Sequence, residues 1–250
     1  MLKLSIITPS YNQGQYIEET IISVLNQNFA SFEHIIIDGG STDNTVDVLK
    51  KYSHLKWVSE KDNGQADALN KGLKISTGDI IGWINSDDYY EENIFPSVVS
   101  NFSDELVDWV VGNLTFLRES KKLVVPDTSK KVTYESLLRD PDIVRQQPTF
   151  FRRSALETVG GLNPVFHLVM DLDLWLRMAK KSSPLMVNAN WAYFRLHEAQ
   201  KTVAQCIKPQ IEEIKFLYQR ENYTSLRKYK FFMRKYLHIL RAHIKRIITQ

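Results

Sequence analysis

IIGWINSDD, at residues 80–88, is the stretch of this 250-residue chain that points most directly to its fold. Its first five residues form a short apolar run, which is typical of a β-strand buried on both faces. The run ends at Asn85, and the carboxylates of Asp87 and Asp88 follow within three residues. Open α/β sheets bind ligands at the carboxyl ends of their parallel strands, so this pattern predicts a ligand site here.

Asp87 and Asp88 also indicate what kind of ligand to expect. Adjacent carboxylates repel each other and lose solvation when they are buried, so they need a cation or solvent nearby. Carboxylate oxygens suit Mg²⁺ or Mn²⁺, which often connect protein carboxylates to the phosphates of a substrate. A solvated Asp-Asp turn that caps a following helix is the alternative.

Composition narrows the class of protein. Hydrophobic residues make up 43% of the chain, which is enough for a substantial core. The single cysteine, Cys206, excludes an internal disulfide framework and a zinc site built on cysteine pairs. No charged region followed by a cleavable apolar region precedes the first predicted strand, so we expect no secretory signal, and no apolar run reaches the length of a membrane span. We therefore expect a cytoplasmic protein.

Apolar runs alternate with helical spacing along the first 88 residues. This pattern predicts strands at 4–8, 34–38, 57–59 and 80–84, with helices at 13–27, 43–52 and 66–75 between them. Such alternation is typical of an α/β fold with a mostly parallel sheet. The second half is more mixed. It predicts a longer strand at 108–117, extended segments at 146–151, 184–188 and 191–196, helices at 154–159 and 171–180, and a loop at 124–131.

Three predicted strands end in polar residues, at 8–12, at Asp38 and at 85–88, and these ends should meet at one edge of the sheet. An acidic residue after the second strand commonly contacts a ribose or a base. No G-x-G-x-x-G follows the first strand and no G-x-x-x-x-G-K-[ST] occurs, which disfavours a dinucleotide dehydrogenase and a P-loop NTPase. A nucleotide site whose phosphates are neutralised by a metal remains.

Five segments occur in order along the chain: TPSYNQGQYIEETIISVLNQ (8–27), IIIDGGSTDNT (35–45), SEKDNGQADALNKGL (59–73), TGDIIGWINSDD (77–88) and MDLDLWLR (170–177). Together they closely resemble the family 2 glycosyltransferases, inverting enzymes with a GT-A fold that use nucleotide-diphosphate sugars. The resemblance covers roughly residues 1–200. It implies a Rossmann-like, mostly parallel sheet flanked by helices, with a nucleotide-sugar half at 1–100 and an acceptor half at 101–200.

The resemblance also implies roles on the donor side. Pro9 and Tyr11 match the walls of the base pocket, and Asp38 matches the residue that contacts the edge of the nucleobase. Asp62 and Asn70 match a segment beside the nucleotide. Family members often have an arginine immediately before that asparagine, whereas this chain has a leucine. One cationic contact is therefore missing or is supplied by another residue.

The metal-binding signature of the family is Asp-x-Asp, and Asn85 occupies its first position. The resemblance then implies Asp87 as the ligand of Mn²⁺ or Mg²⁺, with Asp88 or Asn85 in contact with the sugar or ribose. Arg195 and His197 match a late motif that often closes over the diphosphate. His197 is a candidate metal ligand or phosphate contact, and a purely structural histidine is the alternative.

Asp171 matches the second residue of the family's Glu-Asp motif, where the general base is expected, and Met170 replaces the glutamate. This base removes the proton of the acceptor hydroxyl as its oxygen attacks the donor sugar in line. Asp173 is the rival candidate, about 200° away around a helix, and we expect it to have a structural role. Gln146 and Gln147 lie in the segment that usually faces the acceptor.

The net charge of +3 hides a basic tail. Residues 222–250 contain eight Lys or Arg and no Asp or Glu, which leaves a net charge of −5 on residues 1–221. Apolar and aromatic residues recur in steps of three and four from Tyr229 to Ile248. We expect residues 201–250 to form a basic amphipathic helical tail that lies on an anionic membrane surface. Packing against the domain or within a homodimer is the alternative, and no RNA-binding module suggests a nucleic-acid partner.

These features together predict a glycosyltransferase of the hexosyltransferase type on the inner face of the cell membrane. We expect it to move a sugar from a UDP-sugar, or from a dTDP- or GDP-sugar, to a glycan or lipid-linked acceptor. The expected chemistry is a metal-assisted single displacement that inverts the anomeric centre. A non-catalytic nucleotide-sugar-binding module is the alternative, suggested by the three departures from the family pattern. The presence of Asp38, Asp87 and Asp171 argues against it.

Overall fold

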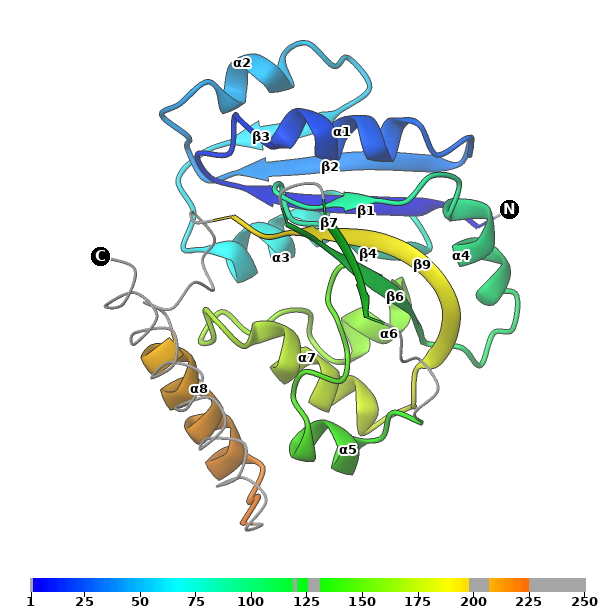
Figure 1. Cartoon of the computed structure of the whole chain (residues 1–250), viewed down its shortest axis with the longest axis vertical. Helices are drawn as coiled ribbons and strands as arrows, with labels where there is room; N and C mark the ends of the chain where they lie inside the picture. The colour runs from blue at the N-terminus through cyan, green and yellow to red at the C-terminus, as the bar shows by residue number, and fades with distance from the viewer. Residues whose placement is uncertain (1, 119–120, 126–130, 198–206, 225–250) are drawn as a thin grey trace.

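The computed structural model describes residues 2–118, 121–125, 131–197 and 207–224 of the chain. In this part of the chain one sheet runs through both halves, with helices on both of its faces (Figure 1). The predicted α/β class is confirmed. The predicted division at residue 100 remains a proposal, because strands from both sides of that position pair within the same sheet.

The first half alternates strands and helices as predicted. Its elements are β1 (Leu4–Ser10), α1 (Ile17–Leu25), β2 (Phe32–Asp38), α2 (Thr45–Leu49), β3 (Lys56–Ser59), α3 (Gln65–Ile75) and β4 (Ile80–Trp83). Strands β3, β2, β1 and β4 lie side by side in that order, and each neighbouring pair is parallel. Every residue of β1 and β4 is buried, as expected for strands covered on both faces.

Two of these elements differ from the prediction at their ends. Strand β1 continues through Pro9 to Ser10. Proline has no N–H to donate to a neighbouring strand, but β1 pairs with β4 only as far as Ile7, so no ladder hydrogen bond is lost on that side. Helix α1 begins at Ile17 rather than near residue 13. The N–H groups of Gln13 and Gly14 instead bind side chains of the loop after β2.

The second half joins the sheet mainly through antiparallel strands. Its elements are β5 (Tyr89–Tyr90), α4 (Phe95–Asn101), β6 (Trp109–Arg118), β7 (Lys121–Val125), α5 (Tyr134–Arg139), β8 (Thr149–Arg152), α6 (Arg153–Thr158), α7 (Met170–Ala179), β9 (Leu185–Arg195) and α8 (Ile207–Arg220). Strand β8 runs antiparallel to β4 and β6, while β6 and β9 are parallel. The prediction of a loop at 124–131 is partly wrong, since β7 extends to Val125.

The two strands expected at 184–188 and 191–196 are one continuous strand, β9, and this prediction is corrected. Polar residues in the middle of β9 suggested a break, but they bind partners on β6. Asn113 Nδ2 donates to Asn188 Oδ1 at 2.9 Å, and the Thr115 hydroxyl donates to Asn190 Oδ1 at 2.7 Å. Irregular register around Asn113 lets the pairing continue past this point.

Helices cover both faces of the sheet. Helices α1 and α2 cover one face, and α3, α6 and α7 cover the other (Figure 1). Trp109, Phe151 and Trp175 stack with ring centroids 5.5–6.4 Å apart beneath α7. The basic segment from Tyr229 to Ile248 lies outside the described residues. None of the helices in the described ranges is both long and apolar enough to cross a bilayer.

Gly82 provides a test of how tightly the sheet is packed at the start of the site. A Cβ at this position of β4 would lie 2.7 Å from the ring of Phe150 and 2.8 Å from the Ile6 side chain. We predict that Gly82→Ala lowers the free energy of unfolding by about 1–3 kcal/mol, because buried neighbours must move. Urea denaturation measures this as a lower midpoint at unchanged m-value, and an unchanged midpoint would contradict the packing described.

Candidate active site

Helix α1 holds the turn between β4 and β5 through a stripe of polar side chains. The hydroxyl of Thr20 donates to the carbonyl oxygens of Ser86 and Asp88, at 3.0 and 2.6 Å. Ser23, three residues further along the helix, and Gln27, two residues past its end, accept backbone N–H groups from β5 and from the residues that begin α4. This role was not predicted, although three polar residues at helical spacing on a buried stripe are a usable signal for it.

Asn85, which is half-buried, is the centre of an amide network just after β4. Its Oδ1 accepts the amide of Gln65 at 2.7 Å and the indole N–H of Trp83 at 2.9 Å. Its Nδ2 donates to Gln146 Oε1 at 3.1 Å and faces the Asp88 carboxylate at 3.4 Å. An asparagine fits this position because the buried carboxylate needs a donor beside it, and a second carboxylate would supply none.

Asp88 lies beneath the turn and is fully buried. Its carboxylate accepts the backbone N–H of Arg195 at 3.1 Å and the amide of Gln147 at 2.9 Å. Burial, and after it the charge of Asp87, raise the pKa of Asp88 well above its ordinary value. Gln146 is also buried, and its amide donates to the carbonyl oxygen at the end of β4. Donor contact by Asp88 and acceptor contact by the two glutamines therefore stay predictions.

Asp87 has a different partner from Asp88, because its side chain contacts His197. The two side chains are separated by 110 positions in sequence, yet Asp87 Oδ2 and His197 Nε2 lie 3.1 Å apart. The ring of His197 packs on Tyr16, with centroids 4.4 Å apart. The described residues contain no group of three or more His, Cys, Asp or Glu that could hold a metal. One carboxylate and one imidazole fit a Mg²⁺ or Mn²⁺ that takes its remaining ligands from phosphate and water.

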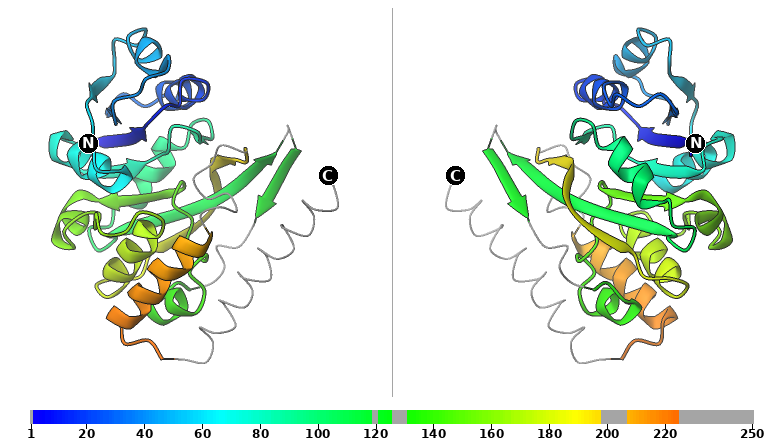
Figure 2. Two further views of the ribbon diagram at one scale, coloured as in Figure 1. Left: turned by 90° about the vertical axis from the view of Figure 1, so that its left-hand side faces the viewer. Right: turned by 90° about the vertical axis from the view of Figure 1, so that its right-hand side faces the viewer.

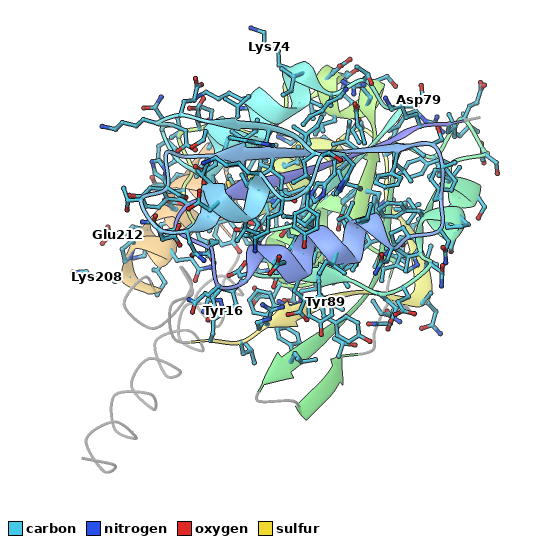
Figure 3. The ribbon with its side chains drawn as sticks, turned by 90° about the horizontal axis from the view of Figure 1, so that it is seen from above. Tyr16, Lys74, Asp79, Tyr89, Lys208 and Glu212 are labelled. Carbon is cyan, nitrogen blue, oxygen red and sulfur yellow. The ribbon has the colours of Figure 1, made fainter. Side chains whose placement is uncertain are left out.

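Arg195 lies two residues before His197, and its guanidinium is held by α1. It pairs with Glu19 at 2.6 Å and lies over the rings of Tyr16 and Tyr89, at 5.2 and 5.4 Å from their centroids. Figure 3 shows Tyr16 and Tyr89 projecting beside α1. The backbone N–H of Arg195, rather than its side chain, reaches the aspartate turn. Its predicted contact with the diphosphate is not tested.

The predicted base pocket lies at the carboxyl ends of β1 and β2. Ser10 and Asp38 are register partners there, which places Pro9 and Tyr11 beside Asp38. The Asp38 side chain is fully buried and accepts both the backbone N–H and the hydroxyl of Ser41, as well as the hydroxyl of Ser59. Tyr11 is 59% exposed, so its ring is open to a ligand.

Asp62 joins this pocket, whereas Asn70 faces away from it. A Cβ on Gly39 would lie 2.9 Å from the Asp62 carboxylate, so Asp62 lies directly against the end of β2. Asn70 uses both ends of its amide on the backbone of Leu162, at 2.8 and 2.9 Å. This contact fixes α3 to the loop after α6, and a nucleotide contact by Asn70 is left as a prediction.

Asp171 lies in the first turn of α7 and is half-buried. Burial raises its pKa to about 6, and the Asp142 carboxylate adds to that rise. The backbone N–H of Leu172 and the charge of Arg145 oppose it. A carboxylate with a pKa near neutrality can accept a proton and still be ionised at pH 7, as a general base requires.

Asp173, the rival base, is fully buried and occupied by two arginines. Its carboxylate pairs with Arg177 at 2.7 Å and with Arg220 at 2.5 Å. Two strong ion pairs occupy this carboxylate and make it unavailable to a substrate. The structure therefore favours the structural role predicted for Asp173. Neither arginine was identified from the sequence. The pair with Arg220 depends on how α8 packs against α7, whereas the spacing of four residues between Asp173 and Arg177 on one helix could have predicted the other pair.

The amide network predicts what an aspartate at position 85 would do. We expect Asn85→Asp to lower the free energy of unfolding by about 1–3 kcal/mol, because it removes two donors and adds a charge beside Asp88. The double variant with Asp88→Asn should recover part of the loss. Asn26→Asp, at an exposed position, is the matched control and should change stability by less than about 0.5 kcal/mol. Urea denaturation of the four proteins decides the matter, and a more stable Asn85→Asp would refute the network.

Known proteins resemble this chain in sequence and in fold. WfgD from Escherichia coli, named a UDP-Glc:α-D-GlcNAc-diphosphoundecaprenol β-1,3-glucosyltransferase, is 28% identical over 80% of this chain and 79% of its own length. The S. aureus TarS structure superposes with a TM-score of 0.66 and 17% identity over 85% of this chain, which spans 39% of TarS. A shorter TarS fragment was solved with UDP-GlcNAc.

A second solved structure extends the likeness in fold. It is the mannosyltransferase PcManGT from Pyrobaculum calidifontis, in complex with GDP-Man and Mn²⁺, with a TM-score of 0.66 and 18% identity over 95% of this chain and 70% of its own. The fold is that of the GT-A glycosyltransferases. The model of the family described as glycosyl transferase family 2 matches residues 5–160, so the chain belongs to that family.

Proposed function

We propose that this glycosyltransferase moves a sugar from a UDP-sugar to a glycan or to a lipid-linked sugar, with inversion at the anomeric carbon. The observation that carries the proposal is the 3.1 Å approach of Asp87 to His197 at the ligand-binding edge of the parallel strands. WfgD, named for a UDP-sugar donor, supports the choice of nucleotide. The TarS complex with UDP-GlcNAc supports it further.

Each residue group of the proposed donor site then has one task. Pro9, Tyr11 and Asp38 bind the base, with Asp62 closing the pocket against the end of β2. Asp87 and His197 would hold Mg²⁺ or Mn²⁺, which when bound neutralises charge on the departing diphosphate. The PcManGT complex with Mn²⁺ supports this assignment.

Asp171 acts on the acceptor side. Its carboxylate accepts the proton of the acceptor hydroxyl while that oxygen forms the new bond to the anomeric carbon, and the bond to the diphosphate breaks. The pKa of about 6 keeps most Asp171 carboxylates ionised at neutral pH. Asp173 cannot share this task because it is buried between two arginines.

The alternative, a non-catalytic binding module, loses its main support once the three departures from the family pattern are explained. Asn85 is required by the amide network. Leu69 and Met170 are 2% and 6% exposed and pack in the same apolar core. These substitutions serve packing and hydrogen bonding, so none of them is a sign of lost activity.

We also propose that the tail predicted at 201–250 contacts the inner face of the cell membrane through its basic part, residues 225–250, which lie outside the described residues. The earlier part of the predicted tail does not serve this purpose, since Ile207–Arg220 form α8, which packs in the core of the domain. A homodimer formed by the segment 225–250 is the competing proposal. Both rest on the charge and spacing of that segment alone.

Nucleotide binding tests the donor side. A ligand that binds only the folded state at about 100 times its Kd adds about 2.7 kcal/mol to stability, which a thermal shift detects easily. We predict that UDP with Mn²⁺ raises the melting temperature, that chelator removes most of the shift, and that GDP, dTDP and CDP do less. Asp87→Ala should lose the metal-dependent part. A protein that no nucleotide stabilises would contradict the proposal.

The pH dependence of turnover tests the base. Because Asp171 must be deprotonated to accept a proton, kcat should fall about tenfold per pH unit below pH 6 and level off above pH 7. Asp171→Asn should lower kcat by about 10²- to 10⁴-fold and remove this limb, while UDP binding is kept. Asp173→Asn should instead lower the melting temperature. An acidic limb that survives in Asp171→Asn would identify a different base.

A further inference from the structure

Helix α8 lies beyond the residues that match the family model, yet it is part of the same core as the helix that carries Asp171. Ile211, Ile214, Leu217 and Tyr218 of α8 are buried in that core. The Tyr218 hydroxyl also donates to the carbonyl oxygen of Leu138 in α5 at 3.0 Å. Figure 2 shows α8, in orange, beside α7 and α5.

The polar face of α8 reaches the start of α7 through one carboxylate. Glu213 accepts the backbone N–H groups of three consecutive residues, His167, Leu168 and Val169, at 2.8–3.2 Å. These residues immediately precede Met170, where α7 begins. Helix α7 has no side-chain cap of its own, since its N-cap residue is Val169. Glu213 therefore fixes the segment that leads into α7, including the N–H of the N-cap residue Val169, from a different helix, and its charge also suits the positive end of α7.

A second contact fixes the rotation of α7. Arg220, two turns beyond Glu213 on α8, pairs with the buried Asp173 carboxylate, which also binds Arg177 within α7. Glu213 thus binds residues just before Asp171 in the sequence, and Arg220 binds Asp173 just after it. A carboxylate in the first turn of a helix moves with that turn, so the orientation of Asp171 depends on both contacts.

The opposite wall of the site lies close to the capped segment. A Cβ on Gly64, at the start of α3, would lie 3.5 Å from Nδ1 of His167. The segment bound by Glu213 therefore connects the base-bearing helix to the Asp62–Gly64 turn beside the predicted nucleotide pocket. Movement of this segment would alter the distance between the proposed base and the donor.

We propose that Glu213 is a positioning residue for the transfer reaction: by binding the N–H groups of residues 167–169 from α8, it fixes the start of α7 so that Asp171 faces the attacking oxygen. This inference rests on the proposed role of Asp171 as the base. It assigns a task in the reaction to α8, and Glu213 itself touches no substrate.

The test compares Glu213→Ala, Glu213→Gln and Glu212→Ala in the full chain. Glutamine keeps an oxygen that can accept the three N–H groups, and alanine removes it. Glu212 is the neighbouring exposed residue on α8, seen on its outer side in Figure 3, and serves as the matched control. Release of UDP from UDP-glucose and from UDP-GlcNAc with Mn²⁺ is measured from pH 5 to 8. Amide hydrogen exchange of residues 166–172 and the thermal shift with UDP are measured alongside.

We expect Glu213→Ala to lower kcat at least tenfold, to leave KM for the donor within twofold, and to shift the acidic limb of the pH profile. Exchange at 166–172 should become at least tenfold faster. Glu213→Gln should stay within threefold of the wild type in kcat, and Glu212→Ala should match the wild type. All variants should keep the UDP-dependent thermal shift.

Three results would overturn the inference. Glu213→Ala with a lower melting temperature but unchanged kcat and pH profile would show a cap that serves stability alone. Unchanged exchange at 166–172 would show that the cap does not hold in solution. Equal losses in the alanine and glutamine variants would exclude hydrogen bonding by the side-chain oxygen. A wild-type protein that shows no UDP shift and no UDP release would instead refute the proposed function, and with it the base that Glu213 positions.

Discussion

The burial of the Asp88 carboxylate is the constraint on which the site depends. A carboxyl group removed from water must be met by hydrogen-bond donors from the protein, and here those donors come from three separate places: the β4 turn, the loop before β8 and the end of β9. The turn is fixed from the other side by the hydroxyl of Thr20. Asp87 is thereby left at the surface of a rigid turn, where it meets His197.

The sequence was sufficient for the part of the fold that local pattern controls. Strands β1, β2 and β4 and the helices between them follow from apolar periodicity, and the polar strand ends follow from the geometry of parallel sheets. Strand β9 was split in two because Asn188 and Asn190 look like a break until their partners on β6 are known. Glu213 was missed because no local pattern encodes a partner many positions away. Thr20 was missed although polar residues at helical spacing on a buried stripe were a signal for its role.

The sequence likewise predicts some properties of the candidate site and not others. Asp38, Asp87 and Asp171 could be named from motifs, since motifs record the residue types that the chemistry needs. Motifs do not record which neighbours occupy a side chain, and the amides of Asn70, Gln146 and Gln147 are all bound to protein groups. The substitution of Asn85 for aspartate likewise becomes intelligible only with the buried Asp88 beside it.

The pairing of Asp87 with His197 also forms late in the synthesis of the chain. His197 follows β9, the last strand of the sheet in the described chain, and 110 positions separate it from Asp87. At synthesis rates of about 5–20 residues per second, roughly 5–20 s pass between the two residues leaving the ribosome. During that interval the parallel half of the sheet can collapse on α1, but Asp87 has no His197 to pair with. A nascent chain is therefore unable to form the proposed metal site until β9 has been made.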